Sequence, residues 1–144
     1  EANIMPICLP WGSEADEPLE KERVTITGWG RTGANMGTSN VLNEVTVPVI
    51  KNEKCASLFS TQGAAYDKKY PEGLRAESLC AGDEKGNDGC TGDSGGPAVL
   101  FRRSRYVLVG IISQGFGCGD PDSPGYYVNI HNPEHLDWIN KVAF

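Results

Sequence analysis

One serine in the sequence, Ser94, has neighbours that suit nucleophilic chemistry. The segment 92–97 reads GDSGGP, so three glycines, one carboxylate and one proline surround the hydroxyl. A glycine-rich turn exposes a side chain and lets backbone N–H groups approach a substrate, because glycine has no Cβ and adopts conformations closed to other residues. A serine hydroxyl also needs a base, and no histidine precedes Ser94. The two histidines, His131 and His135, both follow it.

The segment matches the pattern Gly-x-Ser-x-Gly of the nucleophile elbow in α/β-hydrolases. On that interpretation Asp120 or Asp122 and then His131 would follow in the order serine, aspartate, histidine. An elbow leads from a strand directly into a helix, whereas Ser94 precedes two glycines, a proline and the strand-like run 98–101. An α/β-hydrolase also normally exceeds this length. The sequence therefore argues against the elbow and favours structural roles for both histidines.

The elements that must position Ser94 are predicted to be mostly β-strands. β-Branched and alternating residues indicate strands at 24–29, 42–50, 97–101, 106–112 and 125–130. The long stretch between Cys55 and Cys80 is predicted to be partly helical and then an irregular exposed loop. The chain is expected to be mostly antiparallel β-structure.

The clearest helix signal is at the end of the chain. Asn132 is a good N-cap and Pro133 suits the first helical position. Apolar residues then recur at helical spacing, and Trp138 is expected to pack with them. These apolar residues are Leu136, Ile139 and Val142.

Composition excludes several classes of function. The chain has 144 residues, 39% of them hydrophobic, with 18 glycines and 9 prolines that favour many turns. The formal net charge of -6 makes nucleic acid an unexpected partner. The basic segment 102–105, RRSR, is predicted to be a solvated hairpin tip. No apolar run approaches the roughly 20 residues of a membrane span, and no membrane association is expected. No signal peptide opens the sequence, and its start reads as a processed or internal terminus.

Five cysteines indicate disulfides formed in an oxidising compartment. None lies in the close Cys-x-x-Cys or Cys/His spacing of a zinc site, so neither a metal nor another cofactor is expected. Five is an odd number, so at least one cysteine is free or pairs with another chain. Cys8, which stands alone near the start, is the strongest candidate.

A longer stretch, 88–97, reads DGCTGDSGGP and resembles the nucleophile segment of trypsin-like serine proteases, which have the chymotrypsin fold. Further segments resemble that family in the family's order along the chain. They are TGWG at 27–30, LCAG at 79–82, GIIS at 110–113, PGYY at 124–127 and the helix around 137–139. Because these segments span nearly the whole chain, the resemblance is specific.

The resemblance implies an all-β fold: an antiparallel six-stranded Greek-key barrel followed by a C-terminal α-helix. This barrel would be the second of the two in a chymotrypsin-like domain. We expect residues 1–23 to form the inter-barrel segment, 24–131 the barrel and 132–144 the helix. The family's histidine base and its aspartate lie in the first barrel. They are therefore expected on a separate chain, the N-terminal half of the same catalytic domain, left by a backbone cut.

The resemblance also assigns roles within the loop. Ser94 would be the nucleophile, and the backbone N–H groups of Gly92 and Ser94 would form the oxyanion hole. Asp93 is adjacent to Ser94, so it cannot orient a histidine from behind. In the family this carboxylate turns inward and pairs with the N-terminal amine that zymogen activation creates. Asp93 is therefore expected to be half of an activation ion pair.

Asp88 matches the acid at the base of the primary specificity pocket, where a carboxylate pairs with a substrate Arg or Lys. Gly89 replaces a small side chain often found beside the acid, which removes a hydroxyl contact to lysine and favours arginine. Gln114 stands where the family usually has tryptophan, so the apolar shelf for residues before the cleaved bond is weakened. The substrate-binding residues implied by the resemblance are Asp88, Gly89, Thr91, Ser113, Gln114, Gly115, Gly117 and Gly125.

The resemblance sorts the cysteines as well. It implies the disulfides Cys55–Cys80 and Cys90–Cys118. Cys8 matches the cysteine that tethers the catalytic domain to an N-terminal regulatory chain in two-chain relatives. Another bridge of the family is absent, because Val24 and Leu100 fill the positions that often hold its two cysteines.

The sequence thus predicts a secreted, extracellular serine endopeptidase chain that cleaves after Arg, or Lys, through an acyl-enzyme. The interchain tether at Cys8 and the long 55–80 loop favour a zymogen-activated cascade protease. Expected partners are the N-terminal half, a regulatory chain, protein substrates and protease inhibitors. The alternative is a catalytically inactive protease homologue that acts as a binding or cofactor chain. The intact Gly92, Asp93 and Ser94 argue against it.

Overall fold

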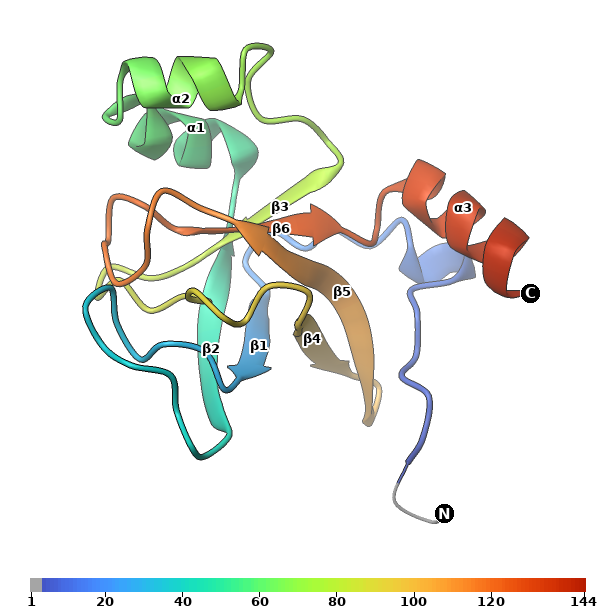
Figure 1. The fold of residues 1–144 in the computed structure, drawn as a ribbon. Helices are drawn as coiled ribbons and strands as arrows, with labels where there is room; N and C mark the ends of the chain where they lie inside the picture. Colours follow the sequence, from blue (N-terminus) through green and yellow to red (C-terminus); the bar gives the residue numbers. More distant parts are fainter. Residues whose placement is uncertain (1–3) are drawn as a thin grey trace.

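The computed structural model describes residues 4–144 and consists mainly of a closed antiparallel β-barrel (Figure 1). Its six strands are β1 (Arg23–Gly28), β2 (Asn43–Ile50), β3 (Ser78–Ala81), β4 (Pro97–Arg102), β5 (Arg105–Gln114) and β6 (Gly125–Asn129). Around the barrel the order is β1-β2-β3-β6-β5-β4, and β4 pairs with β1 to close it. The predicted six-stranded antiparallel barrel with a C-terminal helix is confirmed.

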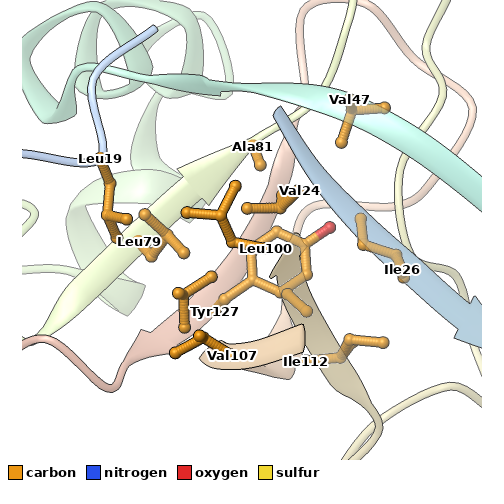
Figure 2. Close-up of a cluster of buried hydrophobic side chains, with 12 residues drawn as sticks. Leu19, Val24, Ile26, Val47, Leu79, Ala81, Leu100, Val107, Ile112 and Tyr127 are labelled. Atoms are coloured by element: carbon orange, nitrogen blue, oxygen red, sulfur yellow. The ribbon is translucent and has the colours of Figure 1, made fainter. Parts of the chain in front are cut away.

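The barrel closes around one hydrophobic core, which Figure 2 shows. Alternate residues of β1 point inward, because successive side chains of a strand face opposite sides. Val24 and Leu100 are both buried in this core. The apolar pair therefore packs the interior at the positions where the family often has a disulfide. Tyr127 of β6 is completely buried in the same cluster.

A second, smaller core lies outside the barrel, in the excursion between β2 and β3. The excursion holds α1 (Asn52–Ser60) and α2 (Ala64–Lys69), which lie together at one side of the barrel in Figure 1. Phe59 is fully buried there, and the disulfide Cys55–Cys80 joins α1 to β3. The predicted partly helical, exposed loop is thus two helices around an aromatic cluster.

Strand β3 has no counterpart among the strands that the sequence pattern predicts. All four of its residues are buried, so the strand lacks the alternation of polar and apolar residues that marks a half-exposed strand. Short strands buried on both faces are hard to recognise from periodicity for this reason.

The C-terminal helix α3 (Pro133–Ala143) begins as its sequence predicts. The Asn132 side chain accepts a hydrogen bond from the Glu134 N–H, and Pro133 opens the helix. The expected packing of Trp138 is wrong, because its side chain is 65% exposed. Leu136 is buried, whereas Val142 is 66% exposed, so only the start of the apolar stripe meets the described residues. None of the helices in residues 4–144 has the length and apolar composition needed to cross a bilayer.

The basic segment 102–105 does form a hairpin tip between β4 and β5, and Arg103 and Ser104 are exposed there as predicted, but the prediction is wrong for Arg102. The side chain of Arg102 is only 13% exposed and pairs with Glu17 at 2.5 Å and Glu22 at 2.7 Å. Arg105 pairs at 2.6 Å with Glu14, which is buried. These partners precede the hairpin by 80 or more residues. The cluster fastens the segment before β1, including the short 3-10 helix η1 (Gly12–Glu14), to the barrel.

Candidate active site

Ser94 lies on an exposed turn that links the disulfide-bonded Cys90 to the start of β4. Gly92 and Gly95 have positive φ angles of 99° and 84°, a backbone conformation that side chains with a Cβ rarely adopt. The Gly95 N–H donates to the Ile112 carbonyl at 2.8 Å, which ties the turn to β5. The glycines therefore hold Ser94 at the surface while the turn remains anchored on both sides.

The N–H groups of Gly92 and Ser94 in this turn are free of partners within residues 4–144. The Asp93 N–H donates to the Cys90 carbonyl at 3.0 Å, and the Gly96 N–H to the Asp93 carbonyl at 2.9 Å. By contrast, the N–H groups of Gly92 and Ser94 have no acceptor among residues 4–144, and both residues are exposed. Two exposed backbone donors beside a serine hydroxyl suit an anion that forms on an attacked carbonyl.

The Asp93 carboxylate points away from Ser94 and into the protein. Its Oδ1 accepts a 2.6 Å hydrogen bond from the Gly30 N–H, and its Oδ2 accepts one of 3.1 Å from the Cys90 N–H. A Cβ on Gly28 or Gly30 would overlap this carboxylate. The sequence TGWG around these glycines is thus the wall that receives Asp93.

A cavity of about 150 Å³ adjoins this carboxylate. Its lining includes Gly28, Gly30 and Asn43 from the β1–β2 region, together with Asp93 and Asp88. The two acids therefore face one cavity from the segment that precedes β4.

A separate cavity of about 120 Å³ adjoins Ser94. Its lining includes seven of the residues that the resemblance implies for substrate binding. They are Gly89, Thr91, Ser113, Gln114, Gly115, Gly117 and Gly125. Gly125 has no room for a side chain, because a Cβ would overlap the Tyr127 hydroxyl. Of the eight predicted substrate-binding residues, the structure thus brings all except Asp88 together around the Ser94 cavity.

Asp88 lines the Asp93 cavity and not the Ser94 cavity, although Cys90 borders both. Its Oδ1 accepts a 3.3 Å hydrogen bond from the Gly119 N–H, whereas its Oδ2 is buried without a partner. Burial raises the pKa of Asp88 to about 7, because the charged form is poorly solvated. A buried carboxylate with one unsatisfied oxygen is a group that a cation would stabilise.

The disulfide Cys90–Cys118 joins the two segments on either side of the Ser94 cavity. Next to it, the Gly89 N–H donates to the hydroxyl of Tyr127 at 3.3 Å. Burial raises the pKa of that hydroxyl above its ordinary value of about 10, so it is protonated at neutral pH with or without the shift. Sequence reasoning missed this role of Tyr127, because an aromatic residue in a strand is ordinarily part of the core.

Neither histidine serves Ser94 in the described part of the chain. The His135 Nδ1 lies 2.7 Å from the Asn129 carbonyl, at the start of α3. His131 is half-buried, and burial lowers its pKa. Neither residue lines the Ser94 cavity. A base for the serine is therefore not supplied by residues 4–144.

Cys8 has no disulfide partner among the described residues. It lies beside β5, where the Leu108 N–H donates to the Cys8 carbonyl at 2.9 Å. The residue is partly exposed.

Comparisons with known proteins agree with this arrangement. The sequence model of the family described as Trypsin matches residues 1–139. The chain is 35% identical over 144 residues to "Clotting factor G beta subunit" of Tachypleus tridentatus, covering 98% of the chain and 45% of that protein. It is 42% identical to "Serine protease filzig" of Drosophila melanogaster, over 99% of the chain and 8% of that protein. It is 37% identical to "Phenoloxidase-activating factor 1" of Holotrichia diomphalia, over 94% and 34%. The chain spans less than half the length of these relatives.

Proposed function

Because the chain belongs to the trypsin family of serine proteases, we propose that it is the part of an endopeptidase that carries the nucleophile. The observation that supports this most directly is the exposed Ser94 hydroxyl beside the two free N–H groups of Gly92 and Ser94. Oγ attacks the carbonyl carbon of the peptide bond while its proton passes to a base. The oxyanion is held by the two N–H groups, and the leaving amine takes the proton as the acyl-enzyme forms.

The base and the acid that orients it come from outside residues 1–144 in this proposal. The first barrel, as a separate chain, supplies the histidine and the aspartate. In this chain, residues 1–23 form the inter-barrel segment, residues 24–131 the second barrel and residues 132–144 the C-terminal helix. Support comes from the absence of a histidine in the lining of the Ser94 cavity and from relatives more than twice as long as this chain. The whole catalytic centre would then form where the two barrels meet.

Cleavage follows Arg, or Lys, in this proposal, because Asp88 receives the cation of the residue before the cleaved bond. The unsatisfied Oδ2 of Asp88 supports it, as do Gly115 and Gly125, which add no side chain of their own to the Ser94 cavity. Asp88 borders the neighbouring cavity, so binding has to bring the carboxylate and the cation together past Cys90. An arginine could donate one N–H to Oδ2 and a second, parallel N–H to Oδ1 of the same carboxylate.

Activation from a zymogen is the proposed role of Asp93. A new N-terminal amine would enter the cavity beside this carboxylate and pair with it. The cavity volume of about 150 Å³ and the inward direction of the carboxylate support the proposal. Breaking such a buried pair typically costs about 3–5 kcal/mol, enough to decide whether the loop around Ser94 keeps its active form.

A secreted cascade protease is the proposed setting. Two disulfides in 144 residues support an oxidising compartment. The relatives named for a clotting factor and a phenoloxidase-activating factor support a cascade, with protein substrates and protease inhibitors as partners. The partly exposed thiol of Cys8 supports a disulfide to a regulatory chain.

Labelling with a fluorophosphonate tests the proposed function. In the intact protease that contains this chain, Ser94 should react, and a peptide aldehyde ending in arginine should block the reaction. The variant Ser94→Ala serves as the control and should not react. Absence of labelling under conditions in which trypsin is labelled would favour the inactive homologue. Sequencing the triad positions of the first barrel would then show whether its histidine or aspartate is replaced.

A further inference from the structure

We propose that Lys69, at the end of α2, is a specificity-determining residue that selects an acidic side chain at the third or fourth position before the cleaved bond. The inference rests on the proposed peptidase function and adds, to the requirement for Arg or Lys at the cleaved bond, a preference for an acidic side chain farther along the substrate. No part of the resemblance assigned a role to this lysine. The excursion between β2 and β3 would thereby take part in substrate recognition.

Lys69 lies on the border between two adjoining cavities. A cavity of about 500 Å³ is lined by Lys69, Tyr126, Ser113 and Gln114, and the last three also line the Ser94 cavity. The Lys69 Nζ donates to the carbonyl of Gly115 at 2.9 Å, and Gly115 belongs to the Ser94 cavity. The ammonium group is thus held at the passage from one cavity to the other.

The aromatic cluster fixes this position. The Lys69 Nζ lies 4.9 Å from the ring centroid of Phe116 and 5.8 Å from that of Tyr70, within the range of cation–π attraction. The Phe116 ring packs at 5.2 Å against the buried Phe59 of α1. Because Phe116 follows Gly115 directly, the same packing connects the helices to the wall of the Ser94 cavity.

Lys69 is also the charged group of the larger cavity that lacks an opposite charge. Arg75 pairs with Glu72 at 3.0 Å and with Glu77 at 3.5 Å. His135 contacts the Asn129 carbonyl. No carboxylate lies within ion-pair distance of the Lys69 Nζ in residues 4–144, and its only hydrogen-bond partner there is neutral. Both carboxylates of the lining, Glu72 and Glu77, are held at Arg75, so an anionic side chain that enters beside Lys69 would be the first to pair with this ammonium group.

The path of a substrate follows from the edge of β5. The pairing of β5 with β4 ends at Ile111, so within residues 4–144 the last residues of β5, 113 and 114, and Gly115 after them have one edge without a partner strand. An extended peptide pairs with such an edge. If its residue before the cleaved bond lies beside Ser113, the antiparallel direction brings its third residue opposite Gly115. The third and fourth side chains then lie beside Lys69.

The test compares matched fluorogenic peptides in the intact protease. All carry Arg before the cleaved bond and differ only in having Glu, Gln or Lys at the third or fourth preceding position. At low salt, kcat/KM should favour Glu by about two- to fivefold, the range of a partly exposed ion pair. The preference should vanish in Lys69→Met, reverse to favour Lys over Gln in Lys69→Glu, and persist in Lys69→Arg. The matched control Lys68→Met, one position earlier on α2, should retain it.

Two results would overturn the inference: equal kcat/KM for the Glu and Gln peptides in the unaltered protease, or an undiminished preference in Lys69→Met. In both cases Arg cleavage and fluorophosphonate labelling of Ser94 persist, so the proposed function stands. Loss of that labelling in the unaltered protease overturns both. Should Lys69→Met fail to fold, Lys69→Glu takes its place in the comparison. In the unaltered protease a preference due to charge must also weaken as NaCl is raised from low to about 1 M.

Discussion

Replacing Gly28 with alanine gives the sharpest test of how the nucleophile loop is held. A methyl group at Gly28 would overlap the Oδ1 of Asp93. Relief requires the carboxylate to leave its two N–H donors, Gly30 and Cys90. Hydrogen bonds to a charged group contribute about 1.5–3 kcal/mol each, so losing both costs about 3–6 kcal/mol.

That free energy predicts a large effect on Ser94. Each 1.4 kcal/mol is about a factor of ten in an equilibrium constant, so the ordered loop should become about 100- to 10,000-fold less populated relative to displaced forms. We expect the rate of fluorophosphonate labelling in the intact protease to fall by a similar factor. The thermal midpoint should drop by more than about 6 °C, at about 2–4 °C per kcal/mol for a domain of this size.

Gly37→Ala is the matched control, because a Cβ at Gly37 meets no atom within 4 Å. Its labelling rate and thermal midpoint should equal those of the unaltered protein. The reasoning is refuted if Gly28→Ala labels within twofold of Gly37→Ala and melts at the same temperature. Such a result would mean that Asp93 moves without disturbing Ser94.

Three further predictions concern the specificity acid, the arginine cluster and the excursion. Because burial raises the pKa of Asp88 to about 7, this group is ionised above that pH and neutral below it. Benzamidine affinity measured by calorimetry should therefore weaken as pH falls from 8 to 6, by up to tenfold per pH unit, whereas Asp88→Asn should bind weakly with no such pH dependence. Arg102→Ala should lower the free energy of unfolding in urea by about 1–3 kcal/mol, because Glu22 loses its ion-pair partner and Glu17 keeps only Arg103; an unchanged midpoint would contradict the proposal that the cluster holds the segment before β1. Replacing both Cys55 and Cys80 with alanine should cost about 3 kcal/mol for a loop of this length, and equal urea stability would show that the aromatic cluster alone holds the excursion.

Local patterns predicted most of the barrel and the helix start, because strand alternation and helix capping are properties of neighbouring residues. The sequence pattern did not predict β3, since burial on both faces removes the alternation of polar and apolar residues. The ion-pair partners of Arg102 could not be predicted for another reason. Glu17 lies 85 residues earlier, and only the closed barrel brings the two side chains together. Trp138 was predicted to pack because helical spacing shows which residues share a face but not whether that face has a neighbour.

Less of the candidate site than of the barrel could be predicted from local sequence. The glycines around Ser94 indicate an exposed turn by their lack of a side chain, and the structure has that turn. Which cavity a side chain lines depends on backbone and side-chain torsion angles that the spacing of residues in the sequence does not give. Asp88, for example, lines the Asp93 cavity and not the Ser94 cavity. The contact of Lys69 with Gly115 likewise depends on how an excursion of two helices lies against a distant strand.

The separate hydrophobic clusters of the barrel and of the excursion imply two units that open independently. Local unfolding generally follows such boundaries. Amide hydrogen exchange should therefore be slowest in β1, β4 and β5 and faster, at a lower free energy of opening, in α1 and α2. An excursion that opens by itself would leave the Ser94 turn tied to β5 while removing Lys69 from its position and loosening Phe116 beside Gly115. The same molecule would then alternate between a selective and a less selective form, with the stability of one small aromatic cluster setting the proportion.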